Sequence, residues 1–390
     1  MRTAPNPPPG SALRGDAPPP TPVRAVVVGA GTIADASHMP AVQALRDRVA
    51  VVGVVDVDDG RARDFAARWS VPVHGTDLRD VLGRCAPDLA IVCAPPAQHR
   101  ELVTQCLDAG VDVWCEKPAG ISLADLDAMS RHERPGGPYV SFVAQHRFGA
   151  GARRLRELLV SGELGRPLVA LCNTMWFRPP EYFDVPWRGR WATEGGGPTL
   201  GHGIHQIDLA LSLLGDWTEV RAMTGTLDRA IEVEDVSMAV VRLESGAMLS
   251  VVCSLLSPRE ESYLRFDLTD ATVELSHVYG YDNDSWTWAP APHVTDSERV
   301  RSWPPTDPGP SGHAAQLAHV LDRLTTGERP ESSGTDARRT LELVTAIYRS
   351  ARTGLPVRRT DLTTDDPFYH SLSGEHPGGT SMTTPSEGEG

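Results

Sequence analysis

The fold is decided by the stretch Val23-Arg24-Ala25-Val26-Val27-Val28-Gly29-Ala30-Gly31-Thr32-Ile33-Ala34. An apolar run typical of a buried strand leads directly into the pattern G-x-G-x-x-A, and a helical stretch follows. The glycines let the backbone turn tightly, and N–H groups at the start of the helix can bind a pyrophosphate. The sequence therefore predicts a dinucleotide site that includes Gly29, Gly31, Thr32 and Ile33.

The next apolar run, residues 49–55, predicts a second strand, and Asp56 ends it. A carboxylate at this point can accept hydrogen bonds from ribose hydroxyls and would repel a 2′-phosphate. No arginine follows Asp56 directly, because Val57, Asp58 and Asp59 come next. The sequence therefore favours NAD over NADP. The alternative interpretation is that Asp56 is only a turn residue.

Strand-like and helical stretches continue to alternate as far as Gln145. Such alternation predicts an α/β fold with a doubly wound parallel sheet, whose strands bind ligands at their carboxyl ends. Pro95, Pro96 and His99 follow the strand expected at 88–94 and are therefore candidate cofactor residues, although His99 could equally be in the first turn of a helix. Further strands are expected at 88–94, 111–115 and 139–144, and helices at 60–69, 98–109 and from Ser122.

Glu116-Lys117-Pro118 closes the strand expected at 111–115. Proline fixes its own φ and favours an extended conformation for the residue before it, so local geometry restrains Lys117. We expect Glu116 and Lys117 to lie where ligands bind, at the carboxyl end of this strand. The alternative is a solvated Lys-Pro turn.

Beyond Gln145 the alternation ends and consecutive strands follow, which predicts a second, α+β domain with a mostly antiparallel sheet. We expect an N-terminal domain over 22–145, a C-terminal domain over 146–372, and disordered tails at 1–21 and 373–390, which are rich in Pro, Gly and Ser. Strands are expected at 167–176, 220–226, 236–243, 247–256 and 263–275, and helices at 152–161, 204–214, 312–326 and 335–352.

A glycine-rich segment, Gly195-Gly196-Gly197, precedes His202, His205 and Asp208. Glycines let backbone and ligand approach closely. His205 and Asp208 are three residues apart on the expected helix, and a histidine beside a carboxylate can act as a general acid or base near neutral pH. A metal site lacks a fourth ligand at a motif spacing, so none is expected. The alternative is a buried helix with a satisfied histidine.

The formal net charge of −14 argues against binding of nucleic acid, which requires a basic surface. The six cysteines form no CxxC pair and mostly lie in apolar runs, which indicates free thiols in a reducing compartment. No apolar run has the length of a membrane helix, and no signal peptide is recognisable at the N-terminus. We therefore expect a cytoplasmic protein that binds neither nucleic acid nor membranes.

From about Val23 to Leu372 the chain resembles the Gfo/Idh/MocA oxidoreductases. The resemblance implies a Rossmann domain and a C-terminal domain whose large open sheet often mediates homodimers or homotetramers. It also implies hydride transfer between nicotinamide and a sugar or cyclitol carbon, with Lys117 polarising or protonating the reacting oxygen and His205 as the acid/base. It rests on the motifs above and on Gln145-His146-Arg147-Phe148, Trp187-Arg188-Gly189 and Asp366-Pro367-Phe368-Tyr369.

One position departs from the family pattern. Many members carry an aspartate four residues before the catalytic histidine, and Gly201 stands there in this chain. The change removes a carboxylate and puts an Asp–Lys–His relay in doubt, although the neighbouring His202 could fill part of the space.

The leading hypothesis is an NAD-dependent oxidoreductase that acts on a polyhydroxylated small molecule. Two alternatives remain open: an NAD-using glycosidase, which the family also contains, and a non-catalytic NAD- and sugar-sensing regulator. Residues suited to stacking on a sugar or to binding its hydroxyls or a phosphate are Arg147, Trp176, Arg178, Tyr182, Trp187, Arg188, His202 and Asp208. For the aromatic residues and arginines between 176 and 188, simple packing of the loop is an equal alternative.

Overall fold

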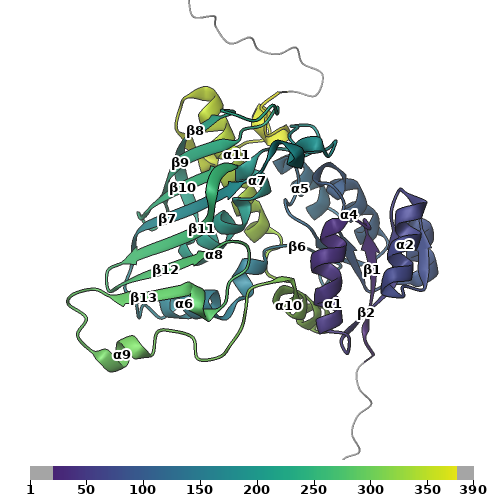
Figure 1. Ribbon diagram of the computed structural model, residues 1–390, viewed down its shortest axis with the longest axis horizontal. Helices are drawn as coiled ribbons and strands as arrows, with labels where there is room; N and C mark the ends of the chain where they lie inside the picture. The colour runs from purple at the N-terminus through teal and green to yellow at the C-terminus, as the bar shows by residue number, and fades with distance from the viewer. Residues whose placement is uncertain (1–20, 376–390) are drawn as a thin grey trace, which may run out of the picture.

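The computed structural model describes residues 21–375. The tails expected at 1–21 and 373–390 lie outside this range, apart from Thr21 and residues 373–375. Two sheets dominate the molecule and lie side by side, each with its own helices (Figure 1). None of the helices in residues 21–375 combines the length and the apolar character needed to cross a membrane.

The first sheet has six parallel strands in the order β3-β2-β1-β4-β5-β6, which confirms the predicted doubly wound fold. Strands β1, β4, β5 and β6 are mostly buried because helices cover both faces of the sheet. The order reverses beside β1, where β2 lies on one side and β4 on the other. The strands are β1 (Val23–Val28), β2 (Val49–Val55), β3 (Val73–Gly75), β4 (Leu89–Val92), β5 (Asp112–Cys115) and β6 (Val140–Phe142).

Three helices of this half, α2, α3 and α5, begin where a side chain caps their free N–H groups. Ser122 accepts a hydrogen bond from the N–H of Asp125, and Asp58 accepts one from Arg61. Two short elements, β3 and α3, were not predicted from the sequence; they lie between α2 and β4. The helices are α1 (Met39–Ala44, preceded by a π-helical turn at Ala34–His38), α2 (Asp59–Trp69), α3 (Leu78–Cys85), α4 (His99–Asp108) and α5 (Leu123–Ser130).

A helix from late in the chain completes this first half. α10 (His313–Thr326) packs against α1, and its Leu317, Val320 and Leu321 join the apolar core formed by one face of the first sheet. Figure 1 shows α10 beside α1, far from the end of the second sheet that carries α11. The half of the molecule that contains the first sheet is therefore not a single continuous segment of the chain.

The second sheet has eight strands in the order β13-β12-β11-β7-β10-β9-β8-β14, and every neighbouring pair is antiparallel except β7 with β10. This confirms the mostly antiparallel C-terminal sheet. The single strand expected at 263–275 is wrong, because Thr269 and Asp270 break it into a hairpin of β11 and β12. The strands are β7 (Pro167–Phe177), β8 (Trp217–Gly225), β9 (Val236–Leu243), β10 (Met248–Ser254), β11 (Leu256–Leu268), β12 (Ala271–His277), β13 (Trp286–Pro290) and β14 (Val357–Arg358).

Helices cover one face of this sheet. The principal ones pack their apolar sides against alternate strand residues such as Cys172, Leu264 and Phe266, which are at most 1% exposed. They are α6 (Ala150–Val160), α8 (Ile204–Leu214) and α11 (Thr335–Thr353), with the short α7 (Pro198–Gly201), α9 (Ser297–Arg301) and α12 (Pro367–His370). Single 3₁₀ turns lie at Pro96–Gln98, Gln145–Phe148, Pro180–Asp184, Asn283–Ser285 and Arg359–Asp361.

Candidate active site

A cavity of about 1220 Å³ lies between the two halves of the molecule. It extends from the glycine turn after β1 to the start of α8, so it is large enough for a nucleotide cofactor and a small second ligand. Predicted residues that line it are Gly29, Gly31, Thr32, Ile33, Asp56, Pro95, Pro96, Glu116, Lys117, Trp176, Arg178, Tyr182, Trp187, Arg188, His202 and His205.

The glycine turn has the properties that a pyrophosphate site requires. Gly29 has φ of +99°, and a Cβ there would lie 2.9 Å from the carbonyl carbon of Cys93, so only glycine fits. At Gly31 nothing lies within 4 Å of a Cβ position, which leaves room for a ligand against the backbone. The residues present therefore fit a dinucleotide.

Asp56 lies at the end of β2, where its Oδ2 accepts a hydrogen bond of 2.9 Å from the N–H of Ala30. Its Oδ1 accepts hydrogen bonds from Nε and Nη2 of Arg61, at 3.1 and 2.8 Å. No arginine follows Asp56 directly in the sequence, but the first turn of α2 places Arg61 in contact with its carboxylate. Arg61 lines the cavity and is the group that a 2′-phosphate would meet.

Glu116 is buried in a cluster with two histidines from distant parts of the chain. Its Oε1 lies 2.8 Å from Nε2 of His38 and 3.3 Å from Nε2 of His313. Burial alone would raise the pKa of Glu116, but the hydrogen bonds from His313 and His38 outweigh it and hold the pKa well below its usual range. The three groups could chelate a cation, yet at these distances direct N–H···O bonds account for the arrangement.

Lys117 reaches across the cavity from the first half to the second. Its Nζ donates a hydrogen bond of 2.7 Å to the carbonyl oxygen of Gly201, at the end of α7. Burial lowers the pKa of the ammonium group, Arg188 and Arg178 lower it further, and Glu116 and Glu194 oppose this effect. The solvated-turn alternative is therefore not what the structure describes.

His205 lies in the first turn of α8, 5% exposed, with its ring 5.3 Å from that of His146 and 6.0 Å from that of Tyr279. Burial is the largest of the causes that lower its pKa well below the usual range, and the charge of Lys117 adds to it. His205 is therefore a neutral imidazole near pH 7.

The glycine triplet serves close packing within the protein. A Cβ on Gly197 would lie 1.9 Å from the carbonyl oxygen of Glu234, and one on Gly196 would lie 2.2 Å from the hydroxyl of Tyr348. The carboxylate of Glu234 accepts the N–H groups of Gly197 and Thr199 at 2.9 and 3.1 Å. These contacts fix α7, and with it the Gly201 carbonyl that Lys117 binds.

A layer of rings and guanidinium groups forms the other wall of the cavity. The guanidinium carbon of Arg188 lies 3.7 Å from the ring centroid of Tyr182, and that of Arg178 lies 4.8 Å from the ring of Trp176. The ring of His202 meets Trp176 edge-on at 5.1 Å. Nε of Arg188 and Nδ1 of His202 are buried without a hydrogen-bond partner among the described residues, so both can bind a ligand.

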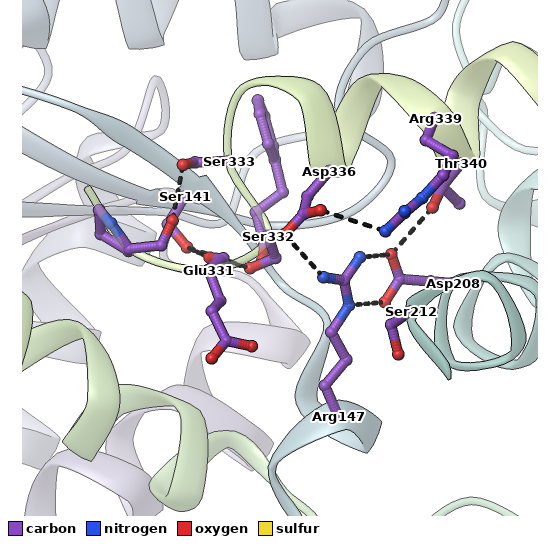
Figure 2. A network of polar contacts seen from close by, with 12 residues as sticks. Ser141, Arg147, Asp208, Ser212, Glu331, Ser332, Ser333, Asp336, Arg339 and Thr340 are labelled. Carbon is purple, nitrogen blue, oxygen red and sulfur yellow. Dashed lines mark hydrogen bonds and ion pairs between the residues drawn. The ribbon is translucent and has the colours of Figure 1, made fainter. Parts of the chain in front are cut away.

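Arg147 and Asp208 lie outside this cavity, which differs from the predicted contact with substrate. Nε and Nη2 of Arg147 form a fork of two 2.6 Å hydrogen bonds to the carboxylate of Asp208 (Figure 2). Asp336 and Thr340 of α11 complete the network. The carboxylate of Asp208 is therefore bound by the buried guanidinium of Arg147.

His99 is the first residue of α4 and also lies outside the cavity lining. It is fully buried, and its ring nitrogens lie 2.9 Å from the carbonyl oxygens of Pro118 and Ala94. The helix-turn alternative describes it better than cofactor contact does. Its ring joins the chain after β4 to the chain after β5, which supports the loop that carries Lys117.

The cavity lining also includes residues that were not predicted from the sequence, among them Arg61, Glu194 and Tyr279. Arg61 could have been found, because it is one helical turn beyond the cap at Asp58. Glu194 directly precedes the glycine triplet, but its residue type alone indicates no role. Tyr279 follows β12, remote from every motif, and no local signal marks it.

Comparison with known proteins agrees with this geometry. Residues 23–142 match an oxidoreductase family with an NAD-binding Rossmann fold, and residues 152–274 match the GFO/IDH/MocA C-terminal domain. D-glucoside 3-dehydrogenase of Escherichia coli (strain K12) is 25% identical over 362 residues, 86% of this chain and 97% of that protein.

Two further proteins are similar over most of their length. D-apiose dehydrogenase of Paraburkholderia graminis is 29% identical, over 84% of this chain and 88% of that protein. The crystal structure of the WlbA dehydrogenase from Bordetella pertussis, in complex with NADH and UDP-GlcNAcA, is 28% identical with a TM-score of 0.76, over 87% of this chain and 99% of that chain. The chain thus belongs to the Gfo/Idh/MocA family and is an NAD-binding oxidoreductase of the sugar-dehydrogenase type.

Proposed function

We propose that this protein transfers hydride between NAD and a hydroxyl-bearing carbon of a sugar, cyclitol or sugar derivative, with Lys117 and His205 handling the proton. The observation that carries the proposal is that both side chains line the cavity that begins at the glycine turn. A hydride-transfer site needs a proton-handling pair beside the nicotinamide end of its cofactor, and a passive NAD sensor needs neither residue.

NAD, when bound, accepts or supplies the hydride. Backbone N–H groups after Gly29 and the carboxylate of Asp56 would hold its pyrophosphate and ribose, and Pro95 and Glu116 would flank its nicotinamide end. Asp56 is already positioned by Ala30 and Arg61. The preference for NAD over NADP rests on this carboxylate.

In the oxidative direction, the hydroxyl proton passes to Lys117 or to His205 as the C–H bond breaks. Because burial lowers the pKa of Lys117, its amine is a more accessible proton acceptor than that of a surface lysine. Neutral His205 can accept the same proton or orient the hydroxyl. In the reductive direction, Lys117 as an ammonium group donates to the carbonyl oxygen.

The second ligand is expected to combine a sugar face with hydroxyls or an anionic group. Trp176, Tyr182 and Trp187 offer ring surfaces for stacking, and Nε of Arg188 is a buried donor without a partner among the described residues. A similar protein, the WlbA dehydrogenase, binds UDP-GlcNAcA in its crystal structure, so nucleotide sugars belong in the set of compounds to test.

The test is a panel of sugars, polyols and nucleotide sugars assayed for NADH absorbance with the wild-type protein and with Lys117→Met. The proposal expects turnover by the wild type and loss of about 10²-fold or more in the variant, with NAD binding retained. Turnover by Lys117→Met at the wild-type rate contradicts it. Release of free sugar without a net change in NADH would support the glycosidase alternative.

We also propose that the open face of the second sheet joins two copies of the chain. Helices cover the opposite face. The open face displays large apolar side chains at paired positions, with Met223 opposite Met238 and Met248 opposite Val169. Met223 is 79% exposed and Met238 57%. A contiguous apolar surface of this kind is typical of a protein–protein interface.

A further inference from the structure

Gly201 has no side chain, and the carboxylate of another residue lies near its Cβ position. A Cβ on Gly201 would lie 3.7 Å from Oε1 of Glu194, and no other atom of the described residues lies within 4 Å of that position apart from the chain neighbours and the backbone of the same helix. Gly201 itself binds the ammonium group of Lys117 through its carbonyl oxygen. A carboxylate is therefore present beside position 201, although it comes from a different point in the chain.

The loop before the glycine triplet holds Glu194 in this place. Its Oε2 accepts a hydrogen bond of 2.5 Å from the N–H of Gly189, which leaves Oε1 directed to the Gly201 side. Glu194 is only 7% exposed and lines the cavity together with Lys117 and His205. A buried carboxylate costs free energy unless it is partnered, so a glutamate held in the cavity that Lys117 also lines calls for a role.

The charged and titratable groups that face Glu194 come from several elements: Lys117 after β5, Arg188 and Tyr182 on the loop before α7, and Glu234 before β9. Burial raises the pKa of Glu194 to about 7, while the Gly189 N–H, Lys117 and Arg188 oppose the rise and Glu234 adds to it. Glu194 in turn opposes the lowering of the pKa of Lys117. The charge of each group therefore influences the pKa of the other.

We propose that Glu194 is the positioning residue for Lys117, supplying from the loop the carboxylate that family relatives carry at position 201. This inference rests on the function proposed above. In the oxidative direction the hydroxyl proton passes to the Lys117 amine, the C–H bond breaks with its electron pair going to NAD, and a C=O bond forms. The ionised Glu194 stabilises the ammonium group that results and keeps it directed to the reacting oxygen.

The first test compares Glu194→Gln with the control Glu232→Gln. Glutamine keeps an acceptor for the Gly189 N–H, so the loop should hold. Glu232 is an exposed glutamate that accepts the N–H of Trp191 on the same loop but does not line the cavity. We expect kcat/KM for NAD reduction to fall by about 10²-fold in Glu194→Gln, with loss of the inflection near pH 7, and to be unchanged in the control.

The second test moves the carboxylate back to the family position. Gly201 does not have positive φ, and its Cβ position meets only Glu194 at ordinary contact distance, so an aspartate can be accommodated. We expect Glu194→Gln/Gly201→Asp to recover kcat/KM to within about tenfold of wild type. Glu194→Gln/Gly201→Ala is the control for the added side chain and should not recover. If neither double variant recovers, or both do, the proposal is wrong.

A third readout needs no substrate. Removing the carboxylate should lower the pKa of Lys117, so acylation of Lys117 at pH 7.5, followed by mass spectrometry, should be about three- to tenfold faster in Glu194→Gln than in Glu232→Gln. Equal labelling rates contradict the positioning role. Faster labelling in a protein that turns over no compound in the panel would leave the Glu194–Lys117 coupling standing and refute the proposed function instead.

Discussion

The buried ion pair of Arg147 and Asp208 predicts a loss of stability without a loss of chemistry. The two residues are 2% and 7% exposed and share two hydrogen bonds of 2.6 Å. In Asp208→Ala the guanidinium keeps only Asp336, 3.2 Å away and half-buried, and loses both short bonds. Breaking a buried pair by removing one partner costs about 3–5 kcal/mol, so the free energy of unfolding should fall by that amount.

For a chain of this length, with an unfolding entropy of about 2.1 cal/mol/K per residue, the loss corresponds to a decrease in Tm of about 4–6 °C. Urea unfolding of the cofactor-free protein gives the free energy, and kcat/KM measured well below the transition gives the chemistry. Asp336→Asn is the matched control, because its partner bond is longer and more exposed, and it should cost at most about 1 kcal/mol. The double variant Arg147→Met/Asp208→Leu removes both charges and should recover most of the lost stability.

The opposite result is equally definite. If Asp208→Ala unfolds like the wild type but loses tenfold or more in kcat/KM, Asp208 contacts substrate or its catalytic groups. The assignment made from sequence would then be right, and the network of Figure 2 would not be its main role.

Three further outcomes are expected. Asp56→Ser should lower kcat/KM for NAD by about 10- to 100-fold and raise it for NADP, because the ribose loses a charged acceptor while Arg61 remains for a 2′-phosphate; unchanged preference in steady-state kinetics would contradict this. Val240→Asp, on the open sheet face, should yield monomers in analytical ultracentrifugation if that face joins two copies. Burial raises the pKa of Glu194 in the folded protein to about 7, from 4.5, so wild-type stability falls as the pH rises from 4.5 through 7. Glu194→Gln should therefore be the more stable protein at pH 8, by up to about 3 kcal/mol, and it should lose that advantage near pH 4.5 in urea titrations.

The parts of the molecule that could be predicted from sequence are those that local chemistry specifies. Gly29 has a conformation and a close approach that exclude other residues, and the valine-rich run 49–55 forms a strand that pairs with β1. Glu116-Lys117-Pro118 lies at a strand end because proline stops the strand there. Each of these features is contiguous in the chain, and each was recognised.

The structure departs from the expectations drawn from the sequence where contacts join distant residues. Nothing near Asp208 shows that Arg147, 61 positions earlier, would take its carboxylate. The same holds for His99, which looked like a ligand residue but binds the carbonyl oxygens of Ala94 and Pro118. The place of Glu194 in the site could not be predicted, because its carboxylate approaches the Cβ position of Gly201 only in the folded backbone.

The position of α10 has a consequence for the order of folding. The apolar face formed by Met39, Phe65 and Ile91 is completed by Leu317, Val320 and Leu321. During synthesis the first sheet is finished at Phe142, but the helix that covers it ends only at Thr326. At roughly 5–20 residues per second, the nascent chain must wait about 10–35 s with this face uncovered. We expect chaperones that bind apolar surfaces to capture ribosome-bound chains stalled before residue 313 and to release those stalled well beyond 326.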